Sequence, residues 1–445
     1  MCSGKAVESG SAVRSPFVVA KQLPDGYYAS AEAMKFIKVY GPKPGASSTT
    51  SYQIRTGGNT MRIRSILVLS FLLSASLFVQ AQITIGVDLS TTGGAASLGM
   101  PAKNALTFAP AEIAGLKVKY VVYDDASDPT MAVQNVKRLI LENKIDALVG
   151  PSITATSLAV IDTVSELKTP MFSFGSATVI VAPMDAKRKW VFKIGGNDDL
   201  YIAAMLRNMV RKGVKTVSII ATDDPFGESN TAELKKQAAP KGIRILDVEK
   251  FSKGDNSVTG QILRITKDNP DAVYIVAVGT AAATPNFALV ERNYKGRIYH
   301  TGSVANPEFL RLGGKAIEGV FVTQSPVFVY DQLPAGYPTK AEATKFGNAY
   351  EPKFGLRSPF AAQVWDTMNI LKIAIPKALK SGAKPGTVQF REALRDAIEE
   401  TKGYKGTMAV FNFTPTDHTG VDQLGMAVIR VQNGGWKLED YADFK

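Results

Sequence analysis

The sequence of 445 residues predicts an α/β fold with two doubly wound lobes. From residue 83 to about residue 303, short apolar segments of strand length alternate with segments whose apolar residues recur at helical spacing. That alternation is typical of parallel sheets covered by helices on both faces. The stretch from residue 83 onward has about 360 residues, more than one hydrophobic core usually supports, so two lobes are expected.

The first half of this stretch alternates strands and helices regularly. The patterns predict strands at 83–89, 116–125, 145–151 and 169–176, and helices at 128–144 and 157–168. Asp128 suits the N-cap of the first helix, and Pro129 suits its first turn, where the missing N–H of proline is no loss. We therefore expect parallel strands joined by helical crossovers.

The second half repeats the alternation and then changes. A helix at 198–213, ended by Gly213, precedes predicted strands at 214–224, 243–251, 270–280 and 297–303, with helices between them. Two long helices at 359–379 and 387–402 follow, and a hairpin at 426–441 turns at Asn433 and Gly434. This closing antiparallel piece indicates that the chain crosses between the lobes more than once.

Residues 61–82, MRIRSILVLSFLLSASLFVQAQ, have the layout of a secretory signal peptide. Two arginines precede an apolar run of about 15 residues, shorter than the roughly 20 that a membrane span needs. Because small residues stand at Val79 and Ala81, we expect a start at Met61 and cleavage after Ala81; a buried helix is the alternative. No cysteine follows the cut to take a lipid, so an unanchored periplasmic protein is expected.

Residues 1–60 contain a near copy of an internal segment. Segments 16–45 and 326–355 are identical at sixteen of thirty positions. Stacked arrays need more than two copies, so a solenoid is not predicted. We interpret residues 1–60 as a non-native or disordered relic of a related gene, outside the working protein; a genuine N-terminal extension is the alternative.

The charge balance argues against nucleic acid as a partner. The chain carries a net charge of +12, but residues 1–82 hold nine Lys or Arg against three Asp or Glu. The remainder holds 43 against 37 without a run of five basic residues, which is typical of an ordinary solvated surface. The only cysteine, Cys2, precedes the leader, and His300 and His418 are the only histidines. We therefore expect no disulfide, thiol nucleophile, metal site or cofactor.

The loops that follow the predicted strands lack catalytic motifs. Ligands of open α/β sheets bind at these carboxyl ends. The sequence contains no G-x-S-x-G elbow, no phosphate-binding loop and no dinucleotide fingerprint. Asp223 and Asp224 are adjacent and are better explained as a helix cap with surface charge than as a matched acid and base.

Two of these loops are instead rich in hydroxyl groups. GPSITATS at 150–157 opens a helix with Ser152, Thr154, Thr156 and Ser157, and FGSAT at 174–178 offers Ser176 and Thr178. Free N–H groups at a helix start, together with hydroxyls, can bind a carboxylate. Ordinary N-capping would also explain one hydroxyl, but not several.

A resemblance to a known family rests on six stretches, which follow one another along the chain in the order that the family has. They are YDDASDP (123–129), VGPSITATS (149–157), DDPFGES (223–229), PDAVYIVAVGT (270–280), EGVFV (318–322) and FREALRDAIEETK (390–402). With them the chain resembles the periplasmic substrate-binding proteins of branched-chain amino acid ABC transporters, the leucine/isoleucine/valine type. The resemblance implies the type I periplasmic-binding fold, with two Rossmann-like lobes joined by three hinge crossings. It places lobe 1 at 83–197 and 302–407, and lobe 2 at 198–301 and 408–445.

The resemblance also implies which residues hold a ligand. In the family, backbone amides and a hydroxyl from the loop matching ITAT hold the ligand carboxylate, which gives this role to Thr154 and Ala155. The loop matching GSA implies carbonyl and amide contacts from Gly175, Ser176 and Ala177.

Two apolar side chains complete the implied site, and one expected group is missing. Phe226 stands where a family aromatic covers the ligand from lobe 2, and Leu98 where a side chain of the first loop packs on it. Members that bind α-amino acids have an acidic residue just past the strand matching VAVGT, whereas this chain reads GTAAATP at 279–285. Ser127 and Ile153 stand where some members have a disulfide.

The missing acid bears on the ligand. A buried ammonium without an anion costs several kcal/mol, so a carboxylate with an aromatic or aliphatic body is favoured. Phe226 also lacks the hydroxyl of a tyrosine. Thr280 and Thr301 would hydrogen-bond the far end of such a ligand, and an amino acid or amide stays open.

The implied activity is capture rather than catalysis. Ligand binds lobe 1, lobe 2 closes over it, and the closed monomer docks on an inner-membrane ABC permease. A sensor that reports ligand to a receptor or to an amide-responsive regulator is the alternative, and neighbouring permease and ATPase genes would favour transport. An α/β hydrolase is disfavoured because the nucleophile elbow is missing.

Overall fold

The computed structural model describes residues 82–443. The predicted leader at 61–81 and all of residues 1–60, including the repeat copy at 16–45, lie outside the described residues. Within the described part, no helix combines the length and the apolar character that crossing a membrane requires.

The first lobe is built on a six-stranded sheet in the order β2-β3-β1-β4-β5-β6. Its strands are β1 (Ile83–Leu89), β2 (Glu112–Ile113), β3 (Leu116–Asp124), β4 (Ala147–Val149), β5 (Met171–Ser173) and β6 (Val191–Lys193). Neighbouring strands pair in parallel, apart from the short antiparallel pair β2 and β3. The four strands predicted for this half are present, and β2 and β6 are additional.

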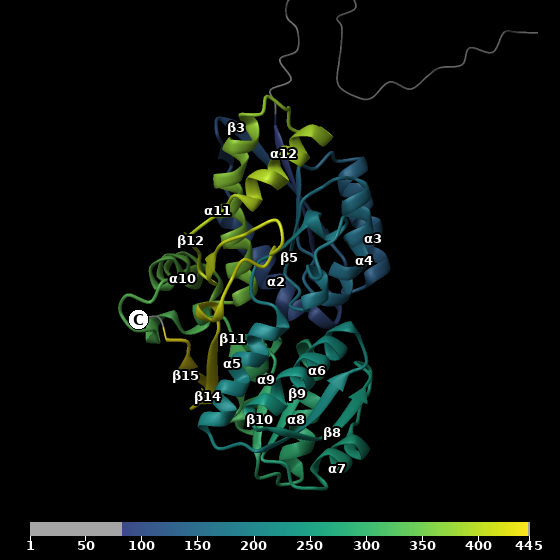
Figure 1. Ribbon diagram of the computed structural model, residues 1–445, viewed down its shortest axis with the longest axis vertical. Coiled ribbons are helices and arrows are strands. Elements are labelled where there is room, and N and C mark those ends of the chain that lie inside the picture. Colours follow the sequence, from purple (N-terminus) through teal and green to yellow (C-terminus); the bar gives the residue numbers. More distant parts are fainter. Residues whose placement is uncertain (1–81, 444–445) are drawn as a thin grey trace, which may run out of the picture. The chain divides into compact units, whose positions relative to one another are not determined.

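Helices cover both faces of this sheet (Figure 1). α3 (Pro129–Leu141) and α4 (Thr154–Glu166) pack on one face; α2 (Ala96–Ala105), α11 (Pro359–Leu379) and α12 (Val388–Glu399) pack on the other. Alternate side chains of a strand point to opposite faces. In β1, Ile85 and Val87 therefore belong to the core beneath α11, while Gly86 faces Leu139 of α3.

Local sequence signals set the ends of several helices. Asp128 is the N-cap of α3 as predicted, and its carboxylate accepts a hydrogen bond of 2.7 Å from the Met131 N–H. Gly213 follows α5 (Asp198–Arg211) with a φ of +74°, a conformation that glycine adopts without strain.

The second lobe is built on a seven-stranded sheet in the order β15-β14-β11-β10-β9-β7-β8. Its strands are β7 (Thr216–Thr222), β8 (Arg244–Phe251), β9 (Ala272–Val276), β10 (Arg297–His300), β11 (Phe321–Gln324), β14 (Ala427–Gln432) and β15 (Gly435–Tyr441). The first five pair in parallel, and β14 and β15 form the predicted hairpin around Asn433 and Gly434.

Further helices and short strands complete the described chain. With α5, the second sheet carries α6 (Pro225–Ala238), α7 (Thr259–Thr266), α8 (Ala283–Glu291) and α9 (Pro307–Gly313). α10 (Lys340–Phe354) and the small ladder of β12 (Tyr404–Lys405) and β13 (Val410–Phe411) lie between β11 and β14 in the sequence.

The chain passes between the lobes three times, because α10, α11 and α12 pack in the first lobe between β11 and β14 of the second sheet. Two predicted boundaries are wrong. The return to lobe 1 at 302 is too early, because β11 pairs with β10 in the second sheet. The passage to lobe 2 at 408 is also too early, because Phe411 and Phe413 belong to the core of the first lobe. Strand–helix alternation shows that a strand exists, but it does not show which sheet the strand joins.

The internal copy of the repeated segment, 326–355, is part of the folded structure. It forms two short 3₁₀ turns within Pro326–Gln332, separated by a kink at Val329, and then α10. Phe346 and Tyr350 of α10 are buried in the core of the first lobe, with ring centroids 5.3 Å apart. This copy therefore packs as ordinary core.

Candidate functional site

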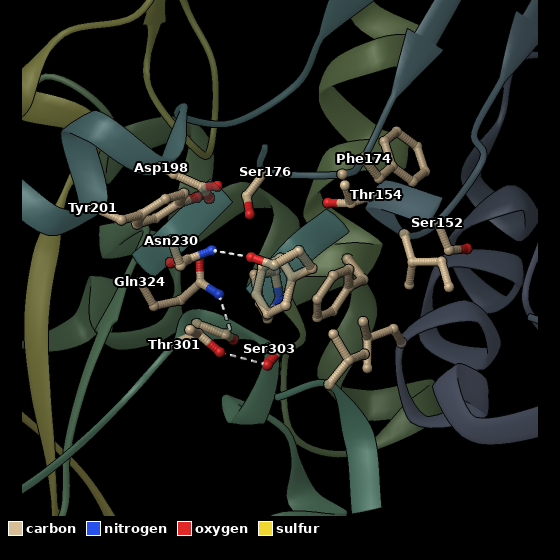
Figure 2. A pocket seen from close by; sticks show the side chains of 18 of the residues that line it. Ser152, Thr154, Phe174, Ser176, Asp198, Tyr201, Asn230, Thr301, Ser303 and Gln324 are labelled. Carbon is tan, nitrogen blue, oxygen red and sulfur yellow. Dashed lines mark hydrogen bonds between the residues drawn. The ribbon is translucent and has the colours of Figure 1, made fainter. Parts of the chain in front are cut away.

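A cavity lies where loops from the carboxyl ends of strands in both sheets converge (Figure 2). The first sheet contributes the loops after β4 and β5, and the second contributes those after β9 and β10 together with the end of β11. The volume of the cavity that the centres of water molecules can occupy is about 60 Å³. A single water needs roughly 10–15 Å³ on the same measure, so a small ligand fits.

The loop after β4 delivers the start of α4 to the cavity. Gly150 makes this possible, because its φ of +97° and a Cβ position 2.0 Å from the Asp88 carbonyl oxygen exclude other residues. α4 begins at Thr154, and the N-cap residue Ile153 has no side-chain acceptor for the first N–H groups. The positive end of a helix that no side chain caps is a favourable place for an anion.

Thr154 is the hydroxyl of this loop that is free to bind a ligand. It is 3% exposed, lines the cavity, and its Oγ1 has no hydrogen-bond partner among the described residues. Ser152 Oγ accepts from the Ser90 N–H at 3.1 Å, and Thr156 Oγ1 donates to the Ile153 carbonyl at 3.2 Å. Of these three hydroxyl groups, only that of Thr154 lines the cavity without a partner among the described residues, while those of Ser152 and Thr156 hold the loop in place.

The loop after β5 lies against the start of α4. The Cβ position of Gly175 is 3.0 Å from the Thr154 nitrogen, so a larger side chain would push the two segments apart. The Ser176 carbonyl accepts from the Asp198 N–H at 3.1 Å and from Lys193 Nζ at 2.5 Å. We call this side, Ser152–Thr154 with Gly175 and Ser176, the α4 wall.

Apolar side chains form another part of the lining. Leu98, Phe174, Phe226 and Phe360 contribute, and Leu98 comes from α2 while Phe360 comes from α11. Phe226 is held at the start of α6 by Asp224, whose carboxylate accepts from the Gly227 N–H at 2.9 Å. These side chains can enclose an apolar ligand body.

Most polar groups that the second lobe contributes are already paired. Thr301 Oγ1 and Ser303 Oγ are 2.8 Å apart, and Ser303 donates to the Ala277 carbonyl at 2.6 Å. The Tyr274 hydroxyl donates to Asn230 Oδ1 at 2.8 Å. Thr301 therefore lines the cavity with its hydroxyl engaged.

Asp198 is a functional candidate that sequence reasoning missed. It is the first residue of α5, is 1% exposed, and lines the cavity beside Tyr201 (Figure 2). Burial raises the pKa of its carboxyl, against the opposing effects of Lys193 and nearby hydroxyls. The sequence reads GGNDDL here, which is the usual pattern of an acidic first turn, so nothing in it indicated a cavity residue.

Lys193 is a buried cation behind the same region. Its Nζ donates to the Ser176 carbonyl and, at 2.6 Å, to Asn197 Oδ1. Burial lowers the pKa of Lys193 to about 8, although Asp198 opposes this shift. We call Asp198, Tyr201 and Gln363 of α11 the α5 wall, and Lys193 supports it from behind.

Six of the nine predicted site residues line the cavity: Leu98, Thr154, Gly175, Ser176, Phe226 and Thr301. Thr280 does not, because its side chain is exposed, so the expected hydrogen bond from Thr280 to the ligand lacks a basis. Ala177 is buried in the core beneath α4, and the side chain of Ala155 packs toward the core of the first lobe. The role predicted for Ala155 concerns its backbone N–H, which belongs to the first turn of α4.

The fold and the cavity can be compared with known proteins. The sequence profile of a family described as "Periplasmic binding protein" matches residues 82–435. The chain belongs to that family. Its members are solute-binding proteins, and the predicted resemblance to the branched-chain amino acid type and to the type I fold is confirmed.

Three relatives show how far the similarity extends. A leucine-, isoleucine-, valine-, threonine- and alanine-binding protein of Pseudomonas aeruginosa is 25% identical over 320 residues, which cover 67% of this chain and 78% of the relative. An extracellular ligand-binding receptor from Rhodopseudomonas palustris HaA2 is 40% identical, with a TM-score of 0.77, over 81% of this chain and all of that chain. A leucine binding protein from Thermotoga maritima MSB8, 24% identical with a TM-score of 0.69, covers 80% of this chain and 98% of its own and shares the fold.

Metal-ligating side chains do not gather in the described part of this periplasmic binding protein. Between residues 82 and 443, no group of three or more His, Cys, Asp or Glu side chains could hold a metal ion. His300 and His418 lie apart, His300 near Asn286 and His418 between Val191 and Glu399.

Proposed function

We propose that this chain captures a small carboxylate-bearing ligand in the cavity between its lobes and delivers it to an inner-membrane ABC permease, without catalysing a reaction. The observation that carries this proposal is the start of α4: among the described residues, no side chain caps it, and the buried Thr154 hydroxyl beside it has no partner. A carboxylate placed there would accept from that hydroxyl and from N–H groups of the first turn.

The remaining lining supports a ligand with an apolar body. Phe226 and Phe360 come from different lobes, so closing the lobes on a ligand would bury its body between two aromatic rings. The amino acids named for the Pseudomonas aeruginosa relative also combine a carboxylate with a small or apolar side chain.

The segments that join the lobes are tied together, which supports capture by hinge motion. Asp366 of α11 accepts from the backbone N–H groups of Thr407 and Met408 at 2.8 and 2.9 Å. Ser325 Oγ, just after β11, donates to the Met408 carbonyl at 2.9 Å. Met408 also lines the cavity. A ligand bound there would therefore contact one of the segments that join the lobes.

The leader-like segment supports a periplasmic location. Cleavage near Ala81 would release a chain whose first residues lead directly into β1, and no cysteine follows to carry a lipid. We propose that the exported protein works as a monomer.

The carboxylate site can be tested with Thr154→Val, which keeps the shape of the side chain and removes the hydroxyl. Calorimetric titration with a ligand found by thermal-shift screening of amino acids and of aromatic and aliphatic acids should show binding about tenfold weaker than for the native protein. Thr178→Val is the matched control, because the Thr178 hydroxyl is also buried without a partner but does not line the cavity. Equal affinity in both variants, or no carboxylate that binds, would overturn the proposal.

A further inference from the structure

The two lobes touch each other at the rim of the cavity, through one turn from each. In the first lobe, the 3₁₀ turn at Gly93–Ala95 lies between β1 and α2. In the second lobe, the 3₁₀ turn at Gly279–Ala282 follows β9. The two turns contact each other, and the second turn also contacts α2. This meeting of the lobes is separate from the three segments that join them.

The contact leaves no room for a side chain at position 279. A Cβ built on Gly279 would lie 2.2 Å from the Gly94 carbonyl oxygen and 3.8 Å from Ser97 Oγ. Gly279 is buried and has a φ of +63°, a conformation that glycine adopts without strain. We call Gly94, Ser97 and Gly279 the rim contact.

The first-lobe side of the rim contact is held in place by hydrogen bonds. The Thr92 hydroxyl donates to Asp124 Oδ2 at 2.7 Å, and the Thr92 N–H donates to Asp124 Oδ1 at 3.2 Å. The Ala95 N–H donates to Ser127 Oγ at 3.0 Å, and this hydroxyl donates to the Thr92 carbonyl at 3.0 Å. The Gly94 carbonyl lies between these anchored residues, so atoms added against it would push the lobes apart rather than bend the turn.

The rim contact borders the cavity. Leu98, which follows Ser97 in α2, lines the cavity, and so does Val278, which precedes Gly279. The Val278 side chain packs against the core of the first lobe and against a core of the second. When two lobes move apart about crossing segments, each lobe stays intact and the contacts between them open. The rim contact therefore exists only while the lobes are closed.

We propose that the rim contact sets how tightly the closed lobes retain a ligand, and that this contact requires glycine at position 279. The inference rests on the proposed function, because it concerns closure on a captured ligand. A group that holds the two turns apart destabilises the closed state alone, so it lowers affinity without touching the ligand. The small residues of GTAAATP at 279–285 thus allow close approach of the lobes.

The test adds atoms to the rim contact from each side. Gly279→Ala places a methyl group against the Gly94 carbonyl, and Ser97→Leu enlarges the facing side chain of the first lobe. Ser97 Oγ is buried without a hydrogen-bond partner among residues 82–443, so its removal costs no hydrogen bond.

Calorimetry uses the purified full chain, freed of bound ligand by unfolding and refolding, with leucine, phenylalanine, benzoate and 3-phenylpropanoate. For each compound that the native chain binds, both variants should bind about tenfold or more weakly, since overpacking would act on the closed state.

Gly242→Ala is the matched control for backbone strain. Gly242 lies in the same lobe with a φ of +70°, and nothing lies within 4 Å of its Cβ position. This variant should keep the native affinity. If Gly279→Ala binds as tightly as Gly242→Ala, the inference is overturned and the proposed function stands. If none of the four compounds binds the native chain, both claims fail.

Small-angle X-ray scattering separates lobe closure from a local change at Val278. With a saturating amount of a compound that binds, the native chain and Gly242→Ala should contract to a smaller radius of gyration, whereas Gly279→Ala should stay larger. A Gly279→Ala chain that binds weakly and still contracts fully would overturn the inference, because its loss would then come from the cavity lining. If Gly279→Ala does not fold, Ser97→Leu decides by the same two measurements.

Discussion

The α4 wall and the α5 wall of the cavity both lie at the start of a helix, yet they offer opposite chemistry. At α4 the N-cap residue Ile153 supplies no acceptor, so the N–H groups and the Thr154 hydroxyl are left for an anion. At α5 the first residue is itself an acid, and the carboxyl group of Asp198 takes side-chain hydrogen bonds from Ser176 and Ser229. The two helix starts therefore present different groups to the cavity, unpaired donors at α4 and a buried carboxyl group at α5.

The largest expected effect comes from Gly150→Ala, which breaks the α4 wall. The φ of +97° is strained for alanine, and its Cβ would lie 2.0 Å from the Asp88 carbonyl oxygen. We expect a loss of about 4 kcal/mol in unfolding free energy, since strain and overpacking add. Urea unfolding measures it.

Gly213→Ala is the control for that loss. Gly213 also has a positive φ, of +74°, but nothing lies within 4 Å of its Cβ position. Strain alone should cost about 1 kcal/mol. Similar losses in the two variants would show that the contact with Asp88 does not shape the α4 wall.

Phe226→Ala removes an aromatic side chain that neither wall supplies. Phe226 is 8% exposed and packs with the core of the second lobe, so truncation should cost about 3 kcal/mol in unfolding free energy and also weaken ligand binding. Phe309→Ala, in the same lobe but away from the cavity, should cost a similar amount of stability and leave affinity unchanged. Calorimetric affinities that fall equally in both variants would contradict a direct contact.

Lys193 gives the α5 wall a pH dependence. Its pKa is lowered in the folded state to about 8 from 10.5, so between these values the unfolded chain binds more protons at this side chain. The contribution of Lys193 to stability therefore rises from pH 8 to pH 10.5 and is lost as pH falls through about 8.

The pH prediction is checked by comparison with Lys193→Met. Urea unfolding of the native protein between pH 8 and pH 10.5 should show a more positive slope of stability with pH than the variant shows. Parallel slopes would mean that Lys193 keeps its ordinary pKa on folding.

The smallest effect is expected from Thr280→Ala. Thr280 is exposed and does not line the cavity, so both stability and affinity should stay within about 0.5 kcal/mol of the native values. A clear loss of affinity for any bound ligand, measured by calorimetry, would show that the loop after β9 contacts the ligand.

The two walls also differ in how far the sequence predicts them. GPSITATS shows hydroxyls at a helix start after a strand, and that local pattern suffices to find Thr154. Asp198 and Gln363 lie 165 positions apart in sequence, on α5 and α11, and each reads locally as an ordinary helix residue. Only the packing of α11 across the first lobe brings Gln363 to the cavity.

The same reason limits the prediction of the fold. Strands such as β1 and helices such as α3 follow from spacing and capping, which are local properties. The partner of β11 depends on which sheet has a free edge after the chain has folded back, and no local pattern reports that. The predicted boundary at 302 failed for this reason.

The most direct measurement is a crystal structure of the protein with a carboxylate ligand that binds in calorimetry. The α4 wall predicts that its carboxylate lies within hydrogen-bond distance of Thr154 Oγ1 and the first N–H groups of α4. A ligand whose carboxylate lies away from α4 would contradict the proposed function.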